Sequence, residues 1–354
     1  MGNSNSRSEI IYSHQPSVTL QEIFERYPGC KIFVTTEATV DRLWLATGDL
    51  LPAGTTVSKV VIPSGEEHKQ LTSVAQIWEF LSRSGADRKS LLVNIGGGML
   101  TDLAGFAAST FKRGIRFVNV PTTLLSQVDA SVGGKTGINF NGLKNEIGTF
   151  REPEAVVIHT GFLKTIDRPN LLSGFAEMVK HGLIYQPEHL EELKHFPLEN
   201  PDLTRLQEII RHSVEIKQHF VLNDPTEKNI RKALNFGHTV GHALESLAMK
   251  QGRPVLHGYA VAWGMIAELF LSVQVCGFPS ETADELSAWL TSVYGKMKFD
   301  ETDYRQLFEL MRHDKKNEAG RINFTLLPAV GQFEINRACS ETQLRNALDF
   351  LQQQ

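Results

Sequence analysis

Short apolar segments alternate with helical segments over the first half of the chain, and this alternation limits the possible folds more than any other feature. The predicted strands are 31–35, 57–62, 90–95, 115–120 and 155–158, with helices at 71–82 and 100–110. Such an alternation is typical of a parallel sheet that is covered on both faces. We therefore expect residues 1–160 to form an α/β domain with a parallel, Rossmann-like sheet.

The strand signal fades after about Gly161, and the second half of the chain has mainly helical patterns. The predicted helices are 173–185, 203–222, 230–249, 260–275, 281–293 and 304–312, with one short strand at 321–327. We therefore expect residues 161–354 to form a mostly α-helical domain. With two domains, the cleft between them is the expected place for a ligand site.

Composition narrows the class of protein. The 354 residues suffice for two domains, and the net charge of −4 gives no indication of nucleic-acid or membrane-surface binding. No apolar run reaches the ~20 residues that cross a bilayer, and the N-terminus lacks a secretory signal pattern. Cys30, Cys276 and Cys339 lie far apart, as expected of reduced thiols. We expect a cytoplasmic protein with no nucleic-acid and no membrane partner.

A cluster of histidines suggests a metal site in the second half. His238, His242 and Glu245 lie close to one face of a predicted helix, and His257 opens the next helical run. Two histidines from neighbouring helices and one carboxylate can hold a divalent metal while leaving positions open for substrate. Two helix histidines with local hydrogen bonds explain the same spacing, so the pattern alone leaves both interpretations open.

A glycine turn at Gly96–Gly98 joins a predicted strand to a helix. Glycines let the backbone approach a ligand, and a helix N-terminus offers unpaired N–H groups to a pyrophosphate. The stretch is not GxGxxG, so the ordinary dinucleotide fingerprint is absent, and tight packing is the other explanation. Ser64–Lys69 follows another strand and offers the Glu66 carboxylate and the Lys69 cation, although a solvated helix cap explains that stretch equally well by itself. Thr122 and Thr123 follow a third strand and offer hydroxyls.

The stretch Gly133–Gly137 resembles part of a phosphate-binding loop. The pattern GxxxxGK[ST] requires a glycine at position 129, which is Asp129, so an ATPase P-loop is rejected. Lys135, Lys144 and Asn145 are candidate anion or carbonyl contacts in what we expect to be a glycine-rich loop.

Taken in order, these motifs closely resemble the 3-dehydroquinate synthase family, from about Ser64 to Pro328. The motifs are Gly96-Gly97-Gly98, Asp102, Pro121-Thr122-Thr123-Leu124-Leu125, Asp129, Gly133-Gly134-Lys135, Lys144-Asn145, Ser173-Gly174, Ala176-Glu177, Lys180-His181-Gly182 and Asn235-Phe236-Gly237-His238-Thr239. Each motif is weak alone, and together they are highly specific.

The resemblance implies the fold and the activity of that family. It implies an NAD-binding α/β domain, a helical domain with one divalent metal (zinc or cobalt) and a homodimer. The implied reaction converts the sugar phosphate 3-deoxy-D-arabino-heptulosonate 7-phosphate to 3-dehydroquinate and phosphate, in the shikimate pathway to chorismate and the aromatic amino acids. It runs by NAD-mediated transient oxidation, phosphate β-elimination, reduction and intramolecular aldol closure.

The resemblance also implies residue roles. The metal ligands are Glu177, His238 and His257, so His242 becomes a contact to a substrate hydroxyl or a proton relay. The catalytic residues are Asp129, Lys135, Asn145, Lys180 and His242. The NAD contacts are Ser64, Gly65, Glu66, Glu67, His68, Lys69, Gly97, Gly98, Met99, Leu100, Thr101, Asp102, Thr122, Thr123, Lys135, Lys144, Phe162, Leu163, Lys164 and Thr165. The substrate contacts are Lys135, Asn145, Lys217, Arg231, Asn235, one of Lys315 or Lys316, and Arg113, which reaches across the dimer.

Some positions depart from the family pattern, and some alternatives stay open. Thr36, Thr101, Leu143, Pro225 and Asn229 stand where other residues are usual. These departures affect the expected loop geometry and cofactor affinity. None of them replaces a residue that the resemblance assigns as a metal ligand or as a cationic contact. The alternatives are a related sugar-phosphate cyclase, a metal-dependent alcohol or glycerol dehydrogenase, and a non-catalytic NAD- or metal-binding regulator.

Overall fold

The computed structural model describes residues 8–141, 143–312 and 322–354, and the chain divides into two compact units, residues 1–166 and 167–354. The boundary expected at residue 160 lies slightly earlier than this division. The intervening residues form the 3-10 helix Thr160–Thr165, and its Phe162 belongs to the core of the first unit. We call residues 8–166 unit 1 and residues 167–354 unit 2.

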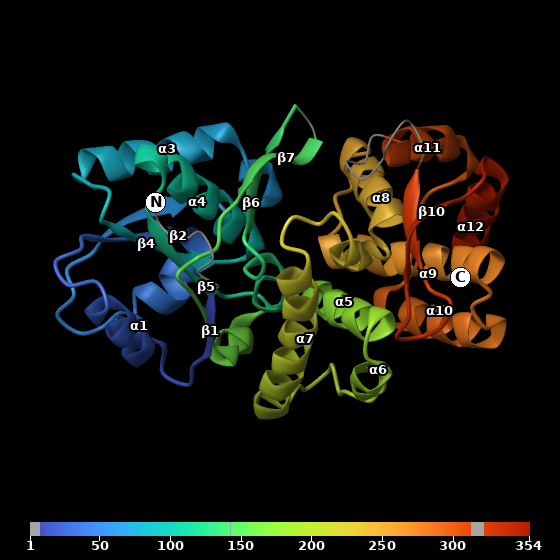
Figure 1. Cartoon of the computed structure of the whole chain (residues 1–354), viewed down its shortest axis with the longest axis horizontal. Coiled ribbons are helices and arrows are strands. Elements are labelled where there is room, and N and C mark those ends of the chain that lie inside the picture. The colour runs from blue at the N-terminus through green and yellow to red at the C-terminus, as the bar shows by residue number, and fades with distance from the viewer. Residues whose placement is uncertain (1–7, 142, 313–321) are drawn as a thin grey trace. The chain divides into compact units, whose positions relative to one another are not determined.

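Unit 1 is built on a six-stranded sheet in which all paired strands are parallel (Figure 1). The strand order is β1 (Glu9–Tyr12), β8 (Ala155–Ile158), β5 (Arg116–Pro121), β4 (Leu91–Gly96), β2 (Ile32–Glu37) and β3 (Ser58–Ile62). Strand β4 is buried along its whole length, as a strand covered on both faces must be. The predicted parallel sheet is therefore confirmed, and β1 is an edge strand that the sequence pattern did not indicate.

Helices cover both faces of this sheet. Helices α3 (Leu71–Arg83) and α4 (Gly98–Thr110) pack on one face, and α1 (Pro16–Glu25) packs on the other. Because successive strand residues point to opposite faces, Leu92 of β4 joins the first cluster and Val93 joins the second.

The glycine-rich stretch after α4 is a hairpin instead of the expected loop. Strands β6 (Lys135–Phe140) and β7 (Leu143–Phe150) pair antiparallel, with Gly137 opposite Gly148. A Cβ atom on Gly148 would lie 2.2 Å from the Thr136 carbonyl oxygen, so the two backbones approach more closely than any side chain allows. Gly137, the last glycine of the stretch that resembled a phosphate loop, therefore serves this close pairing.

Unit 2 is mostly helical, as predicted. Its elements are α5 (Arg168–Ile184), α6 (Pro187–Lys194), α7 (Leu203–Asn223), α8 (His238–Lys250), α9 (His257–Cys276), α10 (Ser280–Tyr294), α11 (Tyr304–Arg312), β9 (Asn323–Leu326), β10 (Glu334–Ala338) and α12 (Glu341–Gln353). The short helix α6 and the C-terminal helix α12 had no clear signal in the sequence. The predicted strand 321–327 corresponds to β9, which pairs antiparallel with β10, and its residue Arg321 lies outside the described residues.

The helix predicted over 230–249 is wrong in its first part. Residues Ile230–Asn235 form a 3-10 helix, and α8 begins only at His238. Gly237 interrupts the two with a left-handed backbone, φ +79°. The spacing of apolar residues gives no information on the φ angle of a glycine. The helical periodicity of the sequence therefore continues across Gly237 although the helix does not.

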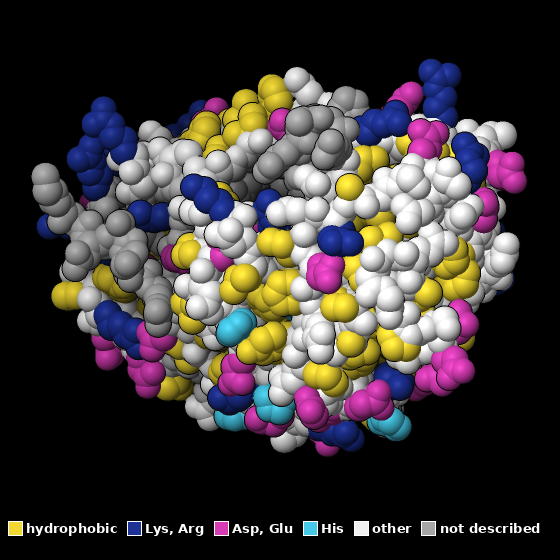
Figure 2. Space-filling model, turned by 45° about the vertical axis from the view of Figure 1, so that its right-hand side comes forward, with side chains coloured by type: hydrophobic (Ala, Val, Ile, Leu, Met, Phe, Trp, Pro, Cys, Tyr) yellow, Lys and Arg dark blue, Asp and Glu magenta, His cyan; other side chains and the backbone are white. Residues whose placement is uncertain are grey.

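Helix α9 is the core helix of unit 2. It packs against α5, α8, α10 and α12. Among the described residues it is the one helix long and apolar enough to cross a membrane, and 67% of its apolar window is buried inside the protein. Such burial is what the central helix of a globular unit requires. Charged side chains of both signs are distributed over the face that Figure 2 shows, with apolar side chains between them.

Candidate functional site

The start of α8 is held by a carboxylate from its neighbour α9. Glu268 is fully buried, and it accepts hydrogen bonds from the backbone N–H groups of Gly237 at 2.6 Å and Val240 at 3.1 Å. A negative charge at a helix N-terminus satisfies N–H groups that have no partner within the helix. This contact fixes where His238, the first residue of α8, presents its ring.

Replacing Gly237 with alanine should destabilise the protein by about 3 kcal/mol, because it combines left-handed strain with overpacking. The new Cβ would lie 2.5 Å from Met265 and 2.9 Å from the Val261 carbonyl oxygen. Gly252 is the matched control, since it has φ +69° but nothing within 4 Å of its Cβ position. Gly252→Ala should cost only about 1 kcal/mol. Urea unfolding measures both, and equal losses would contradict the packing argument.

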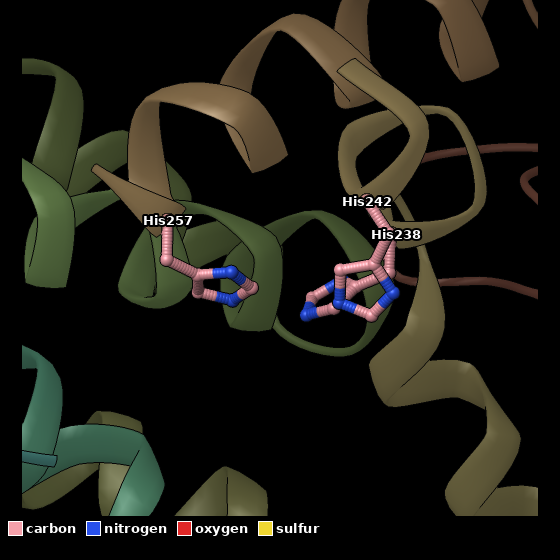
Figure 3. Close-up of side chains that lie close together, drawn as sticks. All are labelled: His238, His242 and His257. Atoms are coloured by element: carbon pink, nitrogen blue, oxygen red, sulfur yellow. The ribbon is translucent and has the colours of Figure 1, made fainter. Parts of the chain in front are cut away.

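Three histidine rings converge in unit 2. One ring nitrogen each of His238, His242 and His257 lies within 4.8 Å of the other two. The ring centroids are separated by 5.2 Å, 5.4 Å and 5.7 Å. Figure 3 shows His257 projecting from the start of α9 toward His238 and His242. The three rings therefore lie close together, as the sequence predicted.

Glu177 of α5 brings a carboxylate to two of these rings. Its side chain is completely buried, and its Oε1 lies 3.5 Å from His238 Nε2 and 3.4 Å from His257 Nε2. Two ligands with bonds of about 2.0–2.2 Å to one tetrahedral metal ion lie roughly 3.4 Å apart. The other carboxylate oxygen, Oε2, accepts a hydrogen bond from the buried Lys180. The spacing therefore suits a shared cation.

The second ring nitrogen of each histidine is oriented by an oxygen. His238 Nδ1 lies 3.1 Å from the Phe236 carbonyl oxygen, and His257 Nδ1 lies 3.3 Å from Glu245 Oε2. A proton on Nδ1 satisfies both contacts, so the Nε2 atoms, which face Glu177, are the ones that would bind a metal. Glu245, which the sequence places on the same helix face as His238 and His242, thus orients the ring of His257.

The local charge also favours a cation. Burial lowers the pKa of His257, but the carboxylates of Glu245 and Glu177 outweigh it and raise that pKa to about 9. Two buried carboxylates beside one imidazole create a negative field. The donor set therefore fits a divalent metal in both geometry and charge.

Buried cations lie elsewhere in unit 2. Lys217 is 6% exposed and Arg231 is 1% exposed, which is rare for such residues. Arg231 Nη1 donates to the Pro225 carbonyl oxygen at 2.7 Å. The carboxylate of Asp224 accepts backbone hydrogen bonds from Lys228, Asn229 and Arg231, which close the loop. Pro225 and Asn229, which depart from the family pattern, are thus built into the support of Arg231.

A polar cluster in unit 1 joins three segments. Lys69 is 4% exposed, and its Nζ donates to Asp102 Oδ2 at 2.6 Å and to Asn145 Oδ1 at 2.5 Å. Glu66 Oε1 accepts from the Asn139 side chain at 2.9 Å, and Lys144 Nζ lies 3.9 Å from the same oxygen. Residues that follow β3, open α4 and lie on β7 therefore meet beside the carboxyl ends of the parallel strands.

Glu37 also lies at this edge of the sheet, and no pattern in the sequence indicated it as a site residue. It ends β2 and accepts hydrogen bonds from the Gly97 backbone and the Ser64 hydroxyl. No side chain caps the start of α4 in the part of the chain that the structure describes. Thr36, one position earlier, is fully buried and donates to the Ile95 carbonyl oxygen at 3.0 Å. Glu37 therefore places a carboxylate next to Thr36, one of the positions that depart from the family pattern.

Removing the Glu37 charge should make stability less dependent on pH. Burial raises the pKa of Glu37 from 4.5 to about 7, because the hydrogen bonds from Gly97 and Ser64 offset only part of the desolvation. The folded state then binds more protons than the unfolded state between these pKa values, so stability falls as pH rises from about 4.5 to 7. Glu37→Gln should be about 2 kcal/mol more stable than the parent at pH 8, with the gain shrinking toward pH 4.5. Urea unfolding at several pH values tests this, and a gain that is constant with pH would refute it.

Comparison with known proteins identifies the family. Sequence models described as 3-dehydroquinate synthase N-terminal and 3-dehydroquinate synthase C-terminal match residues 59–173 and 174–317. The curated 3-dehydroquinate synthase of Parabacteroides distasonis is 46% identical over 345 residues, 98% of each chain.

The chain belongs to the 3-dehydroquinate synthase family.

Solved structures share the fold of this family member. The 2-epi-5-epi-valiolone synthase ValA of Streptomyces hygroscopicus, with NAD+ and Zn2+ bound, superposes with a TM-score of 0.87 at 22% identity, over 99% of this chain and 98% of the other. A 2-deoxy-scyllo-inosose synthase complexed with carbaglucose-6-phosphate, NAD+ and Co2+ gives a TM-score of 0.81 at 24% identity, over 96% and 95% of the two chains. At these identities the likeness establishes the fold alone.

Several other residues that the dehydroquinate synthase resemblance singled out differ in their location and exposure. Asp129 lies in the π-helical turn Ser126–Ala130, and Lys135 is exposed at the start of β6. Arg113 is exposed in a turn with φ +71°. Asn235 donates to Glu227 Oε1 at 2.7 Å. Lys315 and Lys316 lie outside the described residues.

Phe162 is chiefly a core residue of unit 1. Its ring packs edge-on against Trp44 and His159, with centroids 5.0 Å and 5.1 Å away, and it is 2% exposed. Leu163 is also buried. Any cofactor contact from this segment would come from its backbone or from Lys164 and Thr165.

Proposed function

We infer that this chain is a 3-dehydroquinate synthase, a lyase that converts 3-deoxy-D-arabino-heptulosonate 7-phosphate to 3-dehydroquinate and phosphate. The inference is supported by 46% identity over nearly the whole chain to a curated enzyme of that name. The structural observation that carries it is the buried Glu177 carboxylate facing the Nε2 atoms of His238 and His257.

We propose NAD and one divalent metal, zinc or cobalt, as cofactors. When bound, NAD supplies a hydride acceptor that is regenerated within each turnover, and the metal supplies a Lewis acid for the alcohol that is oxidised. Glu177, His238 and His257 would hold the metal. The residues at the carboxyl edge of the unit 1 sheet would hold NAD, with Glu37 added to those the resemblance implies: Ser64–Lys69, Gly97–Asp102, Thr122, Thr123, Lys135, Lys144 and Phe162–Thr165.

The buried cations of unit 2 suit the substrate carboxylate. Arg231 can bind it through two parallel hydrogen bonds, and Lys217 adds a second charge. The phosphate would be bound by Lys135, Asn145, Asn235, Lys315 or Lys316, and by Arg113 acting across a homodimer. His242 lies beside the two proposed ligand histidines, where it can contact a substrate hydroxyl or relay a proton. Lys180 orients Glu177, and Asp129 completes the proposed catalytic residues.

A coupled assay distinguishes this function from its alternatives. Purified enzyme with NAD, Zn2+ or Co2+ and the heptulosonate phosphate should release phosphate without net accumulation of NADH. A related cyclase would act on a sugar phosphate that lacks the carboxylate, for which the buried Arg231 and Lys217 have no use. A dehydrogenase would accumulate NADH with a simple alcohol. Absence of phosphate release from the heptulosonate phosphate would reject the proposal.

We also propose a cytoplasmic location and a homodimer. Cys30, Cys276 and Cys339 are all free, which suits a reducing compartment. The proposed role of Arg113 requires a second copy of the chain. Analytical ultracentrifugation should give a dimer, and a strictly monomeric, active enzyme would exclude that role.

A further inference from the structure

A second cluster of metal-ligand side chains lies on α6 and α7 of unit 2. His189 and Glu192 are three residues apart on α6, so they share one face of that helix. His212 faces them from α7, which packs against α6. One ligand atom from each of the three residues lies within 4.8 Å of the other two. These residues and helices are separate from the histidines of α8 and α9.

His189 is the unusual member of this cluster. It is 2% exposed, and neither of its ring nitrogens has a hydrogen-bond partner in the described structure. Buried polar groups are normally paired, because an unpaired buried donor or acceptor costs free energy. Burial, with a smaller contribution from His212, lowers the pKa of His189 to about 4. The ring is therefore neutral near pH 7, and a nitrogen lone pair is available to a metal without competition from a proton.

Glu192 supplies an anionic oxygen to the cluster. Its Oε2 lies 3.8 Å from His212 Nδ1, and its Oε1 lies 3.8 Å from Arg205 Nε. Both separations are too long for hydrogen bonds. Donor atoms that share an ion through bonds of about 2.0–2.2 Å lie roughly 3–4 Å apart. Arg205 faces the other carboxylate oxygen and leaves Oε2 directed at His212.

We propose that His189, Glu192 and His212 form a second site for a divalent transition metal, which links α6 to α7. Two imidazoles and one carboxylate suit Zn2+ and also Co2+, Ni2+ and Cu2+. A carboxylate and an imidazole three residues apart on one helix also occur, in the reverse order Glu-x-x-His, at the metal sites of helical bundles. The half-exposed His212 side chain can rotate to shorten the distances.

Metal stoichiometry of the full-length protein tests this site. The protein is loaded with one Zn2+ and with NAD, then titrated with Co2+ and, in parallel, with Zn2+. We expect roughly one further ion per chain, a visible Co2+ spectrum of nitrogen and oxygen ligands, and a rise in Tm on metal addition. His212→Ala and Glu192→Gln should lose all three effects. His195→Ala is the matched control, since it removes an exposed histidine at the end of α6 that lies outside the cluster, and it should retain them.

Two further variants keep the outcome decisive. His189→Leu fills the buried position without a ligand atom, so it should fold and lose the second ion. His257→Ala should lose the first ion and keep the second, which separates this site from the proposed catalytic metal. A parent protein that binds no ion beyond the first would overturn the proposal. Retention of the second ion by both His212→Ala and Glu192→Gln would overturn it as well.

Discussion

Glu177→Ala should lose the bound metal and slow phosphate release by about 1,000-fold. A Lewis-acid metal contributes several kcal/mol of transition-state stabilisation, of which about 4 kcal/mol accounts for that factor. Glu177 Oε1 faces both proposed ligand nitrogens at 3.4–3.5 Å, so its removal takes away the anionic member of the set. His257→Ala should behave in the same way. Metal analysis after gel filtration and a phosphate-release assay measure the two effects.

His242→Ala is the informative comparison for this prediction. Its ring lies 5.2 Å from that of His238 and 5.7 Å from that of His257, so position alone does not exclude it from the ligand set. If His242 acts on substrate, its alanine variant should retain the metal and still lose rate. Equal metal loss in the three variants would instead make His242 a ligand.

Arg231→Ala should raise the KM for the heptulosonate phosphate by about 100-fold. Leaving a carboxylate without its charged partner in a buried site costs about 2–5 kcal/mol. Arg231 is 1% exposed, and its guanidinium is held by the Pro225 carbonyl oxygen, so it is preorganised to bind an anion. Arg231→Lys keeps the charge but loses the fork of donors, and should recover only part of the affinity. Steady-state kinetics measures KM for each variant.

The specific role of Arg231 is tested with a substrate analogue that lacks the carboxylate. Arg231→Ala should leave the binding of this analogue nearly unchanged. Arg253→Ala is the control for general loss of a positive charge, because Arg253 is exposed, and its KM should match the parent. If Arg231→Ala weakens both ligands equally, then Arg231 supports the loop and does not recognise the carboxylate.

The parallel sheet could be predicted because its inner strands β4, β5 and β8 are buried on both faces and therefore appear as apolar runs. Strand β4 is the clearest example, with every residue buried. The β6–β7 hairpin could not be predicted in the same way, because its pairing depends on Gly137 and Gly148 facing each other across strands. The break at Gly237 was hidden for a related reason, since periodicity does not report a positive φ.

The missed site residues share a physical property. Glu37, Asp224 and Glu268 act through hydrogen bonds that they accept from backbone N–H groups, and those contacts exist only after folding. Their spacing in the sequence gives no signal. By contrast, His238, His242 and His257 were visible because two lie one turn apart and the third opens the next helix. Glu177 entered only through the family resemblance, since it lies on α5, distant in sequence from the histidines.

The most direct test of the account is an anomalous difference map, measured at the zinc edge, from crystals of the zinc-loaded protein. We expect a peak bonded to Glu177 Oε1 and to the Nε2 atoms of His238 and His257, with the His242 ring beside it and outside bonding distance. A peak that has His242 in place of Glu177, or density for zinc only away from these residues, would contradict the account.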